Sequence, residues 1–267
     1  MKKLFVNLLC VSAFLAFCLL AAVSCHDNVV APFDPNYVDS TGTTDVSGYG
    51  QTDKKCRLTM QTVSEQIFKR YKYDSRGRVI SEIQTRLLGA VSDTIQKIEY
   101  QYNNDNSRVT YKVHNNEVPE AGLNIVATLD AYGRVMHEDN GNNFTYDNRG
   151  HLIKIENPEE SKVISFTWTD DDVTSYTVTI GSYTSVTNFA YYNIADKRGF
   201  CPAREFNFSK FGADALFGKP NKHVLKNEIS DPATDIALQY YFNSRGFVTK
   251  VKPVYSGLYI RYEYDCN

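Results

Sequence analysis

A short hairpin pattern recurs along the chain and sets the strongest limit on its fold. Its clearest copy is YKYDSRGRV, residues 71–79. Asp74 can accept hydrogen bonds from turn N–H groups, and Gly77 supplies the positive φ that ends a type I turn with a bulge. The pattern therefore predicts a β-hairpin in which Tyr73 and Val79 face each other across the two strands.

The hairpin pattern recurs along the chain with some of its residues substituted. Full copies are LDAYGRV at 129–135, FTYDNRGHL at 144–152 and YYFNSRGFV at 240–248, and partial copies begin at Tyr100 and Tyr262. An isolated hairpin is only marginally stable, so several must join in one sheet. We therefore predict an all-β fold, an antiparallel up-and-down meander closed or curled into a soluble barrel-like sheet.

The repeated residues resemble the YD repeat of RHS-type bacterial shell proteins, Y-x-Y-D-x-x-G-R followed by a hydrophobic residue. Over residues 55–267 the chain is more similar still to a family of Bacteroides-type lipoproteins of unknown function, described as having a porin-like fold. In that family such hairpins flank a segment like Leu216–His223 (LFGKPNKH). The resemblance implies an antiparallel barrel-like sheet and brings no known activity, so it carries over no catalytic residue.

The N-terminus is typical of an export signal. Lys2 and Lys3 precede an apolar run, and small residues stand directly before Cys25. We interpret residues 1–24 as a lipoprotein signal peptide and Cys25 as the lipidated residue, although Ala22 stands where such signals usually carry leucine. The alternative is an uncleaved transmembrane anchor, since the run is long enough to span a bilayer. Both interpretations predict a cell-envelope protein, and the first predicts an outer-membrane lipoprotein, periplasmic or surface-exposed.

We interpret residues 25–55 as a flexible tether, because they are rich in Ser, Thr, Gly and Asp and show no periodic spacing of hydrophobic residues. Residues 56–267 are enough for a single domain. Removing Lys2 and Lys3 changes the formal charge from −2 to −4, and charges of both signs are scattered. This argues against nucleic acid as a partner, so the predicted membrane contact is the lipid on Cys25.

Three cysteines remain after the signal and the lipidated residue: Cys56, Cys201 and Cys266. An odd number allows at most one internal bridge, and an exported protein meets an oxidising compartment. A possible disulfide joins Cys56 and Cys266. It would link the first and last strands covalently if these two strands are neighbours in a closed sheet. Buried thiols are the alternative.

Alternation and turn residues predict strands over most of the domain. They are Arg57–Val63, Glu65–Tyr73, Arg78–Leu88, Thr94–Tyr102, Arg108–His114, Leu123–Leu129, Asn143–Tyr146, Leu152–Ile155, Lys162–Thr169, Val173–Ile180, Tyr183–Tyr192, Ile236–Phe242, Phe247–Val254 and Leu258–Tyr264. Residues 193–231 break the pattern with glycines and prolines, so we expect a long loop there, with one short helix near Ser209–Phe217. Such an insertion is a plug, a cap or a functional loop, and the first place to look for a site.

Catalytic patterns are scarce. The histidines lack metal-ligand spacing, and no nucleophile elbow or phosphate-binding glycine loop occurs. Segments 138–142 and 170–172 are rich in oxygen ligands but lack the spacing of a calcium loop, so we interpret them as solvated turns. His137 and His151 lie near hairpin turns and are expected at the surface. The sequence therefore predicts no catalytic, cofactor or metal site.

Three functions remain open. The first is non-catalytic binding of a glycan, peptide or partner protein, which exposed aromatic platforms would favour. The second is a carrier that encloses an apolar ligand in a curled sheet, although the alternation predicts many polar inward positions. The third is a glycan hydrolase, which needs two carboxylates about 5–10 Å apart in a cleft. We predict binding, because no pattern favours an enzyme.

Overall fold

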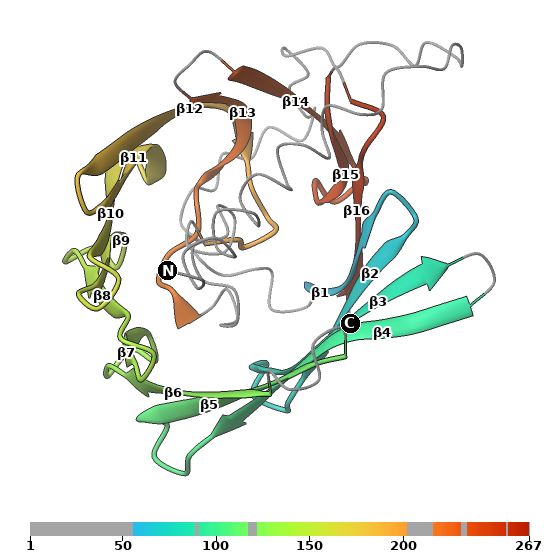
Figure 1. Cartoon of the computed structure of the whole chain (residues 1–267). Coiled ribbons are helices and arrows are strands. Elements are labelled where there is room, and N and C mark those ends of the chain that lie inside the picture. The colour runs from blue at the N-terminus through green and yellow to red at the C-terminus, as the bar shows by residue number, and fades with distance from the viewer. Residues whose placement is uncertain are drawn as a thin grey trace.

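The predicted hairpins join edge to edge in the computed structural model, which describes residues 56–88, 91–116, 122–201, 216–230, 234–254 and 256–266. Sixteen strands follow one another in chain order, and β16 pairs with β1, so the sheet is a closed antiparallel barrel (Figure 1). The strands are β1 (Cys56–Val63), β2 (Ile67–Tyr73), β3 (Val79–Leu88), β4 (Val91–Tyr102), β5 (Arg108–Asn115), β6 (Leu123–Leu129), β7 (Val135–Glu138), β8 (Asn143–Tyr146), β9 (Leu152–Asn157), β10 (Lys162–Thr169), β11 (Asp172–Ile180), β12 (Tyr183–Ala195), β13 (His223–Ser230), β14 (Thr234–Phe242), β15 (Val248–Pro253) and β16 (Ile260–Cys266).

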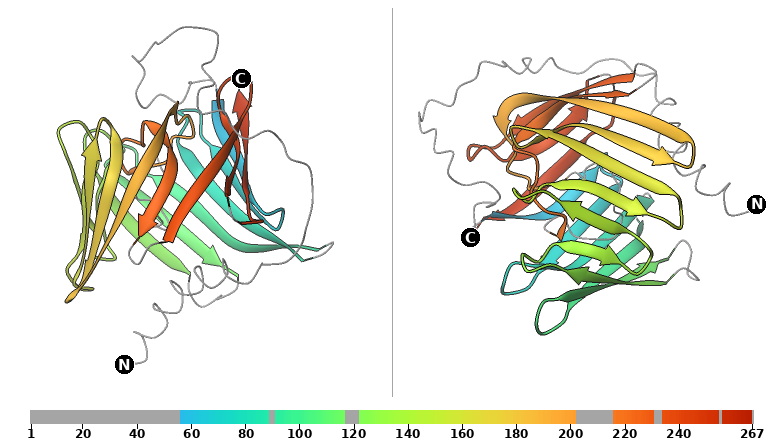
Figure 2. Two further views of the ribbon diagram at one scale, coloured as in Figure 1. Left: turned by 90° about the horizontal axis from the view of Figure 1, so that it is seen from above. Right: turned by 90° about the vertical axis from the view of Figure 1, so that its left-hand side faces the viewer.

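The strand order divides the barrel into two ends. Connections that follow even-numbered strands lie at one end, the turn end, and connections that follow odd-numbered strands lie at the far end (Figure 2). The first residue of β1 and the last of β16 also meet at the turn end. There the sulfur atoms of Cys56 and Cys266 lie 2.15 Å apart across the seam. Cys201 is buried and takes no part in this contact.

Two strands were missed by the sequence prediction. β7 has only four residues, which is too short to show an alternating pattern. β13 lies inside the predicted 193–231 loop, and β12 extends to Ala195, so the loop prediction was too long. The glycines and prolines that suggested a loop lie before β13, while HVLKNEIS itself pairs with both neighbours. The helix expected at Ser209–Phe217 falls almost wholly outside the described residues, whose ranges contain no α-helix.

The aspartate of each hairpin organises its turn. Asp74 Oδ1 accepts hydrogen bonds from the N–H groups of Arg76 and Arg78, each at 2.9 Å. Its Oδ2 accepts from Arg78 Nε at 2.7 Å. Gly77 has φ of 82°, a value that L side chains adopt only with strain. Tyr73 pairs with Val79 beyond a bulge, which confirms the predicted register.

The same geometry recurs in the other copies. Asp130 makes the same three bonds, with Arg134 Nε donating at 2.7 Å. Asp147 binds the His151 side chain instead, and Asn243 keeps only the two backbone bonds. These turns lie together at the turn end, because each follows an even-numbered strand.

The turn carboxylates predict a specific response to acid. Partial burial alone would raise the pKa of Asp130, but hydrogen bonds from the Arg134 backbone and guanidinium lower it below its ordinary value. A carboxyl whose pKa is lower in the folded state stabilises the fold above its unfolded pKa, and the contribution disappears as pH falls through the folded pKa. We expect Asp130→Asn, which keeps the backbone bonds as Asn243 does, to lose about 1 kcal/mol at pH 7 and nothing near pH 2.

Urea unfolding at a series of pH values measures this difference. Glu156→Gln, on the exposed outer face, is the control and should cost little at any pH. A cost of Asp130→Asn that stays constant from pH 7 to pH 2 would contradict the charge-based explanation.

The β2–β3 turn is also clamped to the next hairpin. The Arg78 guanidinium lies 4.1 Å from the ring centroid of Tyr102 on β4, within the range of a cation–π contact. The Tyr102 hydroxyl donates to the Val79 carbonyl at 3.2 Å. Burial raises the pKa of Tyr102 to about 12, so this hydroxyl stays protonated and remains a donor.

Other hairpins repeat the clamp with different residue types. In each, the residue after the turn glycine packs on an aromatic ring whose polar hydrogen is donated to the next backbone carbonyl. The sets are Arg134 with Tyr146 and Val135, His151 with Trp168 and Leu152, and Phe247 with Tyr264 and Val248. The aromatic residues of the repeat therefore hold neighbouring hairpins together, rather than forming an exposed platform.

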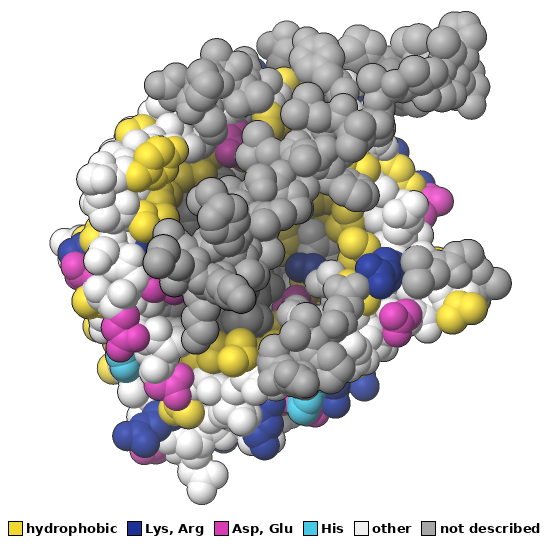
Figure 3. Space-filling view, viewed as in Figure 1, with side chains coloured by type: hydrophobic (Ala, Val, Ile, Leu, Met, Phe, Trp, Pro, Cys, Tyr) yellow, Lys and Arg dark blue, Asp and Glu magenta, His cyan; other side chains and the backbone are white. Residues whose placement is uncertain are grey.

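The two faces of the barrel differ in polarity. On β4, Ile98 and Tyr100 belong to the buried core, while the alternating residues Lys97 and Glu99 form an exposed ion pair at 2.9 Å. Figure 3 shows the same division, with hydrophobic side chains gathered along the inner edge of the ring. The inner face is polar along β2 and β3, where Lys69 lies 3.9 Å from Glu82. The prediction of many polar inward positions is therefore wrong for the β4–β12 sector.

The last part of the connection between β12 and β13, residues 216–222, lies inside the barrel at the turn end. Phe217 is fully buried and packs against Phe144 on β8, with ring centroids 5.3 Å apart. Gly218 follows against the β8–β9 turn, where the Lys219 N–H donates to the Gly150 carbonyl at 3.0 Å. The described part of this connection thus acts as a plug, one of the three roles that the sequence left open.

Candidate functional site

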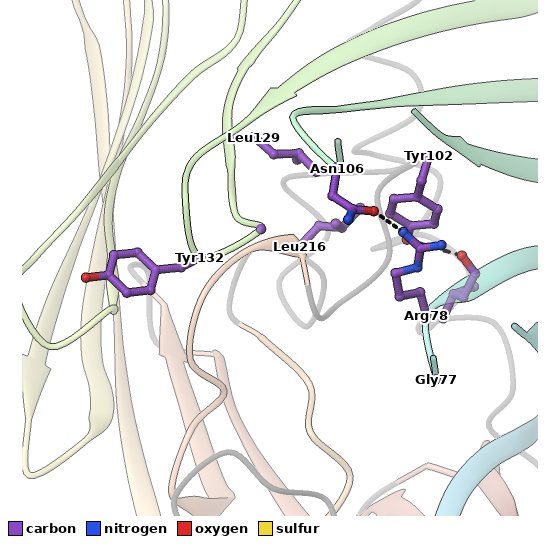
Figure 4. A pocket seen from close by; sticks show the side chains of 9 residues that line it. Gly77, Arg78, Tyr102, Asn106, Leu129, Tyr132 and Leu216 are labelled. Atoms are coloured by element: carbon purple, nitrogen blue, oxygen red, sulfur yellow. Dashed lines mark hydrogen bonds between the residues drawn. The ribbon is translucent and has the colours of Figure 1, made fainter. Parts of the chain in front are cut away.

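A cavity of about 230 Å³ opens at the turn end, between three hairpin turns and the plug (Figure 4). We call it the turn-end pocket. The residues that line it are Gly77, Arg78, Val79, Tyr102, Asn106, Leu129, Tyr132, Gly133 and Leu216. Three consecutive copies of the repeat supply all but Leu216. The hairpin pattern therefore builds the pocket as well as the barrel.

Arg78 and Asn106 form the polar edge of the pocket. Arg78 Nη2 lies 2.7 Å from Asp74 Oδ2, and Arg78 Nη1 donates to the Asn106 side-chain oxygen. Asn106 stands in the longer turn between β4 and β5 with φ of 56°, a conformation that asparagine tolerates better than most residues. Because the Arg78 charge is paired with Asp74, this edge is polar but close to neutral.

The remaining walls are largely apolar. Val79, Leu129 and Leu216 contribute aliphatic surface, and Figure 4 shows Leu129 and Leu216 beside the polar pair. Tyr132 lies at the border, is 84% exposed, and extends away from the labelled cluster. An apolar floor with a few hydrogen-bonding groups at one edge is the usual composition of a small-molecule site. None of the nine lining residues is a carboxylate.

His151 forms a second polar centre, and the expectation that it lies at the surface was wrong. Its side chain is 1% exposed and stacks on Trp168 at 4.3 Å. The ring nitrogens lie 2.9 Å from Asp147 Oδ2 and 2.8 Å from Asp171 Oδ1, and Arg149 also binds Asp171. With both ring nitrogens engaged and the ring covered, His151 holds the β8–β9 turn against β10 and β11.

The two acidic segments are also more buried than expected. Asp172 is 6% exposed and binds the backbone N–H and side chain of His223, which positions the start of β13. Glu138 is 3% exposed, so the prediction of a solvated turn is wrong there too. Within the described residues, no group of three His, Cys, Asp or Glu side chains could hold a metal ion. No helix in that part of the chain is long and apolar enough to cross a membrane.

Sequence reasoning identified the hairpins but not the pocket that they form. Arg78 and Asn106 are far apart in the chain and meet because β3 and β4 pair. The predicted 193–231 loop contributes one residue, Leu216, to the lining of the turn-end pocket. Cys25 lies outside the described residues.

Comparison with known proteins supports the fold. A porin-like protein from Bacteroides uniformis aligns with a TM-score of 0.58 at 14% identity, covering 78% of this chain and 96% of that one. A porin-like protein from Bacteroides vulgatus aligns with a TM-score of 0.32 at 11% identity, covering 78% and 98%. No protein-family model and no curated protein matches the chain. The first alignment agrees with the barrel architecture, at an identity too low to carry function.

Proposed function

We propose that this chain is an exported envelope lipoprotein that binds a neutral glycan end, without catalysis, in the turn-end pocket. The signal-like N-terminus and Cys25 support export and lipid anchoring. Residues 25–55 then serve as the tether, which joins the barrel next to the pocket because β1 begins at the turn end. Charged pairs such as Lys154–Glu156 on the outer face support a barrel that stands in water, since membrane-spanning barrels carry an apolar outer band.

The composition of the turn-end pocket carries this proposal. About 230 Å³ is below the usual size of a drug-like site, and suits one sugar ring or one small side chain. The aliphatic floor can cover the C–H face of a sugar, while the Asn106 amide and the outer edge of Arg78 can meet its hydroxyls. The Arg78–Asp74 pairing favours a neutral ring over an acidic one. A hydrolase is not proposed, because the lining contains no carboxylate pair.

A binding series tests the proposal. We expect the purified full-length protein to bind members of a panel of neutral oligosaccharides, and to bind sialylated ones more weakly. Asn106→Gly suits the positive φ and removes the amide, so it should lower affinity about tenfold without unfolding the barrel. Isothermal titration with the best panel member measures the change.

Tyr183→Ala is the matched control, because Tyr183 is an exposed tyrosine at the far end of the barrel. It should leave glycan affinity unchanged. No binding across the panel, or equal losses in Asn106→Gly and Tyr183→Ala, would contradict a glycan site in this pocket.

A further inference from the structure

The outer surface of the barrel at the β1–β16 seam differs in charge from the chain as a whole. β15, β16, β1 and β2 follow one another around this seam (Figure 1). We call their outward face, together with the β1–β2 turn, the seam wall. Its cationic side chains are Arg57, Arg70, Lys72, Lys250, Lys252 and Arg261, and its acidic side chains are Glu65, Glu263 and Asp265. The seam wall therefore carries an excess of three positive charges on a chain whose formal net charge is −2.

The alternation of side chains along each strand establishes this orientation. Arg261 precedes Tyr262, which belongs to the buried core, and Arg70 precedes Tyr71, which packs on the same core. Because successive side chains of a strand point to opposite faces, both arginines point outward. Lys250 pairs directly with Arg261, so it shares the outward face.

Aromatic rings stand among these cations. Lys250 Nζ lies 4.4 Å from the ring centroid of Tyr259 and 5.4 Å from that of Tyr241, both within the range of a cation–π contact. On the other side of the seam, the Arg70 guanidinium lies 5.7 Å from the ring centroid of Phe68. Cationic side chains mixed with aromatic rings are the composition that proteins present to the interface of a lipid bilayer.

The acidic side chains leave part of the positive charge uncompensated. Glu65 lies 3.2 Å from Arg261 Nη1, on a side chain that is still 52% exposed. Partial burial lowers the pKa of Lys250, and the nearby charges of Arg261 and Lys252 lower it further. These cations therefore repel one another, and an anionic partner relieves that repulsion.

The position of the proposed tether selects a membrane among the anionic partners. Residues 25–55 join the barrel at Cys56, which is the first residue of β1 and hence lies at the seam. A flexible segment of about 30 residues has a root-mean-square reach of about 30 Å, which allows the barrel to lie on its side. The bilayer that holds the lipid is then within reach of the seam wall, whereas a soluble polyanion has no such link to it.

We propose that the seam wall docks on the surface of a bilayer that contains anionic lipid, with Arg70, Lys250 and Lys252 against the headgroups. This inference rests on the lipid anchor of the proposed function and not on glycan binding. The lipid on Cys25 and the seam wall act as two linked contacts with one membrane, which together bind more firmly than either alone. With the barrel axis along the membrane, the turn-end pocket opens sideways into water.

Acetylation of lysines by membrane-impermeant sulfosuccinimidyl acetate, read by mass spectrometry, tests the docking. The full-length protein is reconstituted from detergent into vesicles of phosphatidylcholine alone, or of phosphatidylcholine with an equal amount of phosphatidylglycerol. We expect the anionic vesicles to slow acetylation of Lys250 and Lys252 at least fivefold. A salt concentration of about 1 M, where the Debye length is about 3 Å, should remove this protection.

Lys154 is the internal control for this measurement. It lies on β9, across the ring from the seam, and should react equally in both kinds of vesicle. Unchanged rates at Lys250 and Lys252, or equal slowing of Lys154, overturns the proposal.

Charge-reversal variants test the seam wall itself. Arg70→Glu replaces a headgroup contact by a repulsive charge and should lower the protection of Lys250 at least twofold. Lys154→Glu makes the same change of charge on β9 and should leave the protection unchanged. Equal protection of Lys250 in the two variants overturns the proposal.

Flotation separates the docking from the lipid anchor. Flotation with phosphatidylcholine vesicles, which present no net charge, measures the anchor alone. A protein that floats with these vesicles, but whose lysines are not protected on anionic ones, overturns the docking and leaves the anchor in place. A protein that floats only with the anionic vesicles contradicts the anchor and supports the docking.

Discussion

Gly218→Ala is expected to destabilise the barrel by about 3 kcal/mol or more, and Gly133→Ala by only about 1 kcal/mol. Both glycines have φ near +80°, at 86° and 79°, so the backbone strain of an added side chain is similar. They differ in their surroundings. A Cβ on Gly218 would lie 2.6 Å from the Gly150 carbonyl oxygen and 2.9 Å from Tyr146 Cε1, whereas one on Gly133 meets no atom within 4 Å.

The difference arises because Gly218 is where the plug passes the β8–β9 turn. Relief of the clash requires moving backbone, which would also disturb the Lys219–Gly150 hydrogen bond and the burial of Phe217. Urea unfolding followed by tryptophan fluorescence measures both variants, since Trp168 lies in the adjoining clamp. Equal losses of stability in the two variants would show that the plug does not pack closely against this turn.

Removal of the Cys56–Cys266 bridge is the second large expected effect. The cysteines are 210 residues apart, and loop-closure entropy for a cross-link of that length corresponds to about 5 kcal/mol. We expect Cys56→Ser to lose most of this amount and to unfold at lower urea concentration. The oxidised wild-type chain should weigh about 2 Da less than the reduced one, since a bridge removes two hydrogen atoms.

Adding reductant to the wild type is the control for the serine substitution. It should lower the stability of the wild type to that of Cys56→Ser and leave the variant unchanged. A wild type whose mass and unfolding curve do not respond to reductant would mean that the two thiols are not joined.

The sequence predicted the hairpins well because each turn depends on residues close together in the chain. Asp74, Gly77 and Arg78 contact one another within five positions, and so do Asp130, Gly133 and Arg134. The alternation of apolar and polar residues likewise distinguished the two faces of each strand. It could not show which face is inside, because that depends on closure of the whole ring and not on any one strand.

The site escaped prediction because its residues meet only through strand pairing. Nothing near Asn106 in the chain indicates that its amide reaches Arg78, and nothing near His151 indicates that Trp168 covers it. The sequence placed Glu138 in a solvated acidic turn, and only the strand register, which pairs it with the buried Ala127, shows that it faces the barrel interior. Contacts between segments distant in the chain decide all of these cases.

Neighbour-to-neighbour pairing has a consequence for how the chain reaches its native state. Around the described ring, consecutive strands pair with each other, except at the β1–β16 seam, where the paired strands lie about 200 positions apart. Local pairings form at a small entropic cost, while the seam must overcome the loss of freedom of the entire chain. Assembly should therefore proceed as hairpins added side by side, with ring closure as the final and slowest event. Until then the edges of β1 and β16 are unpaired, and an incomplete ring can capture a second chain.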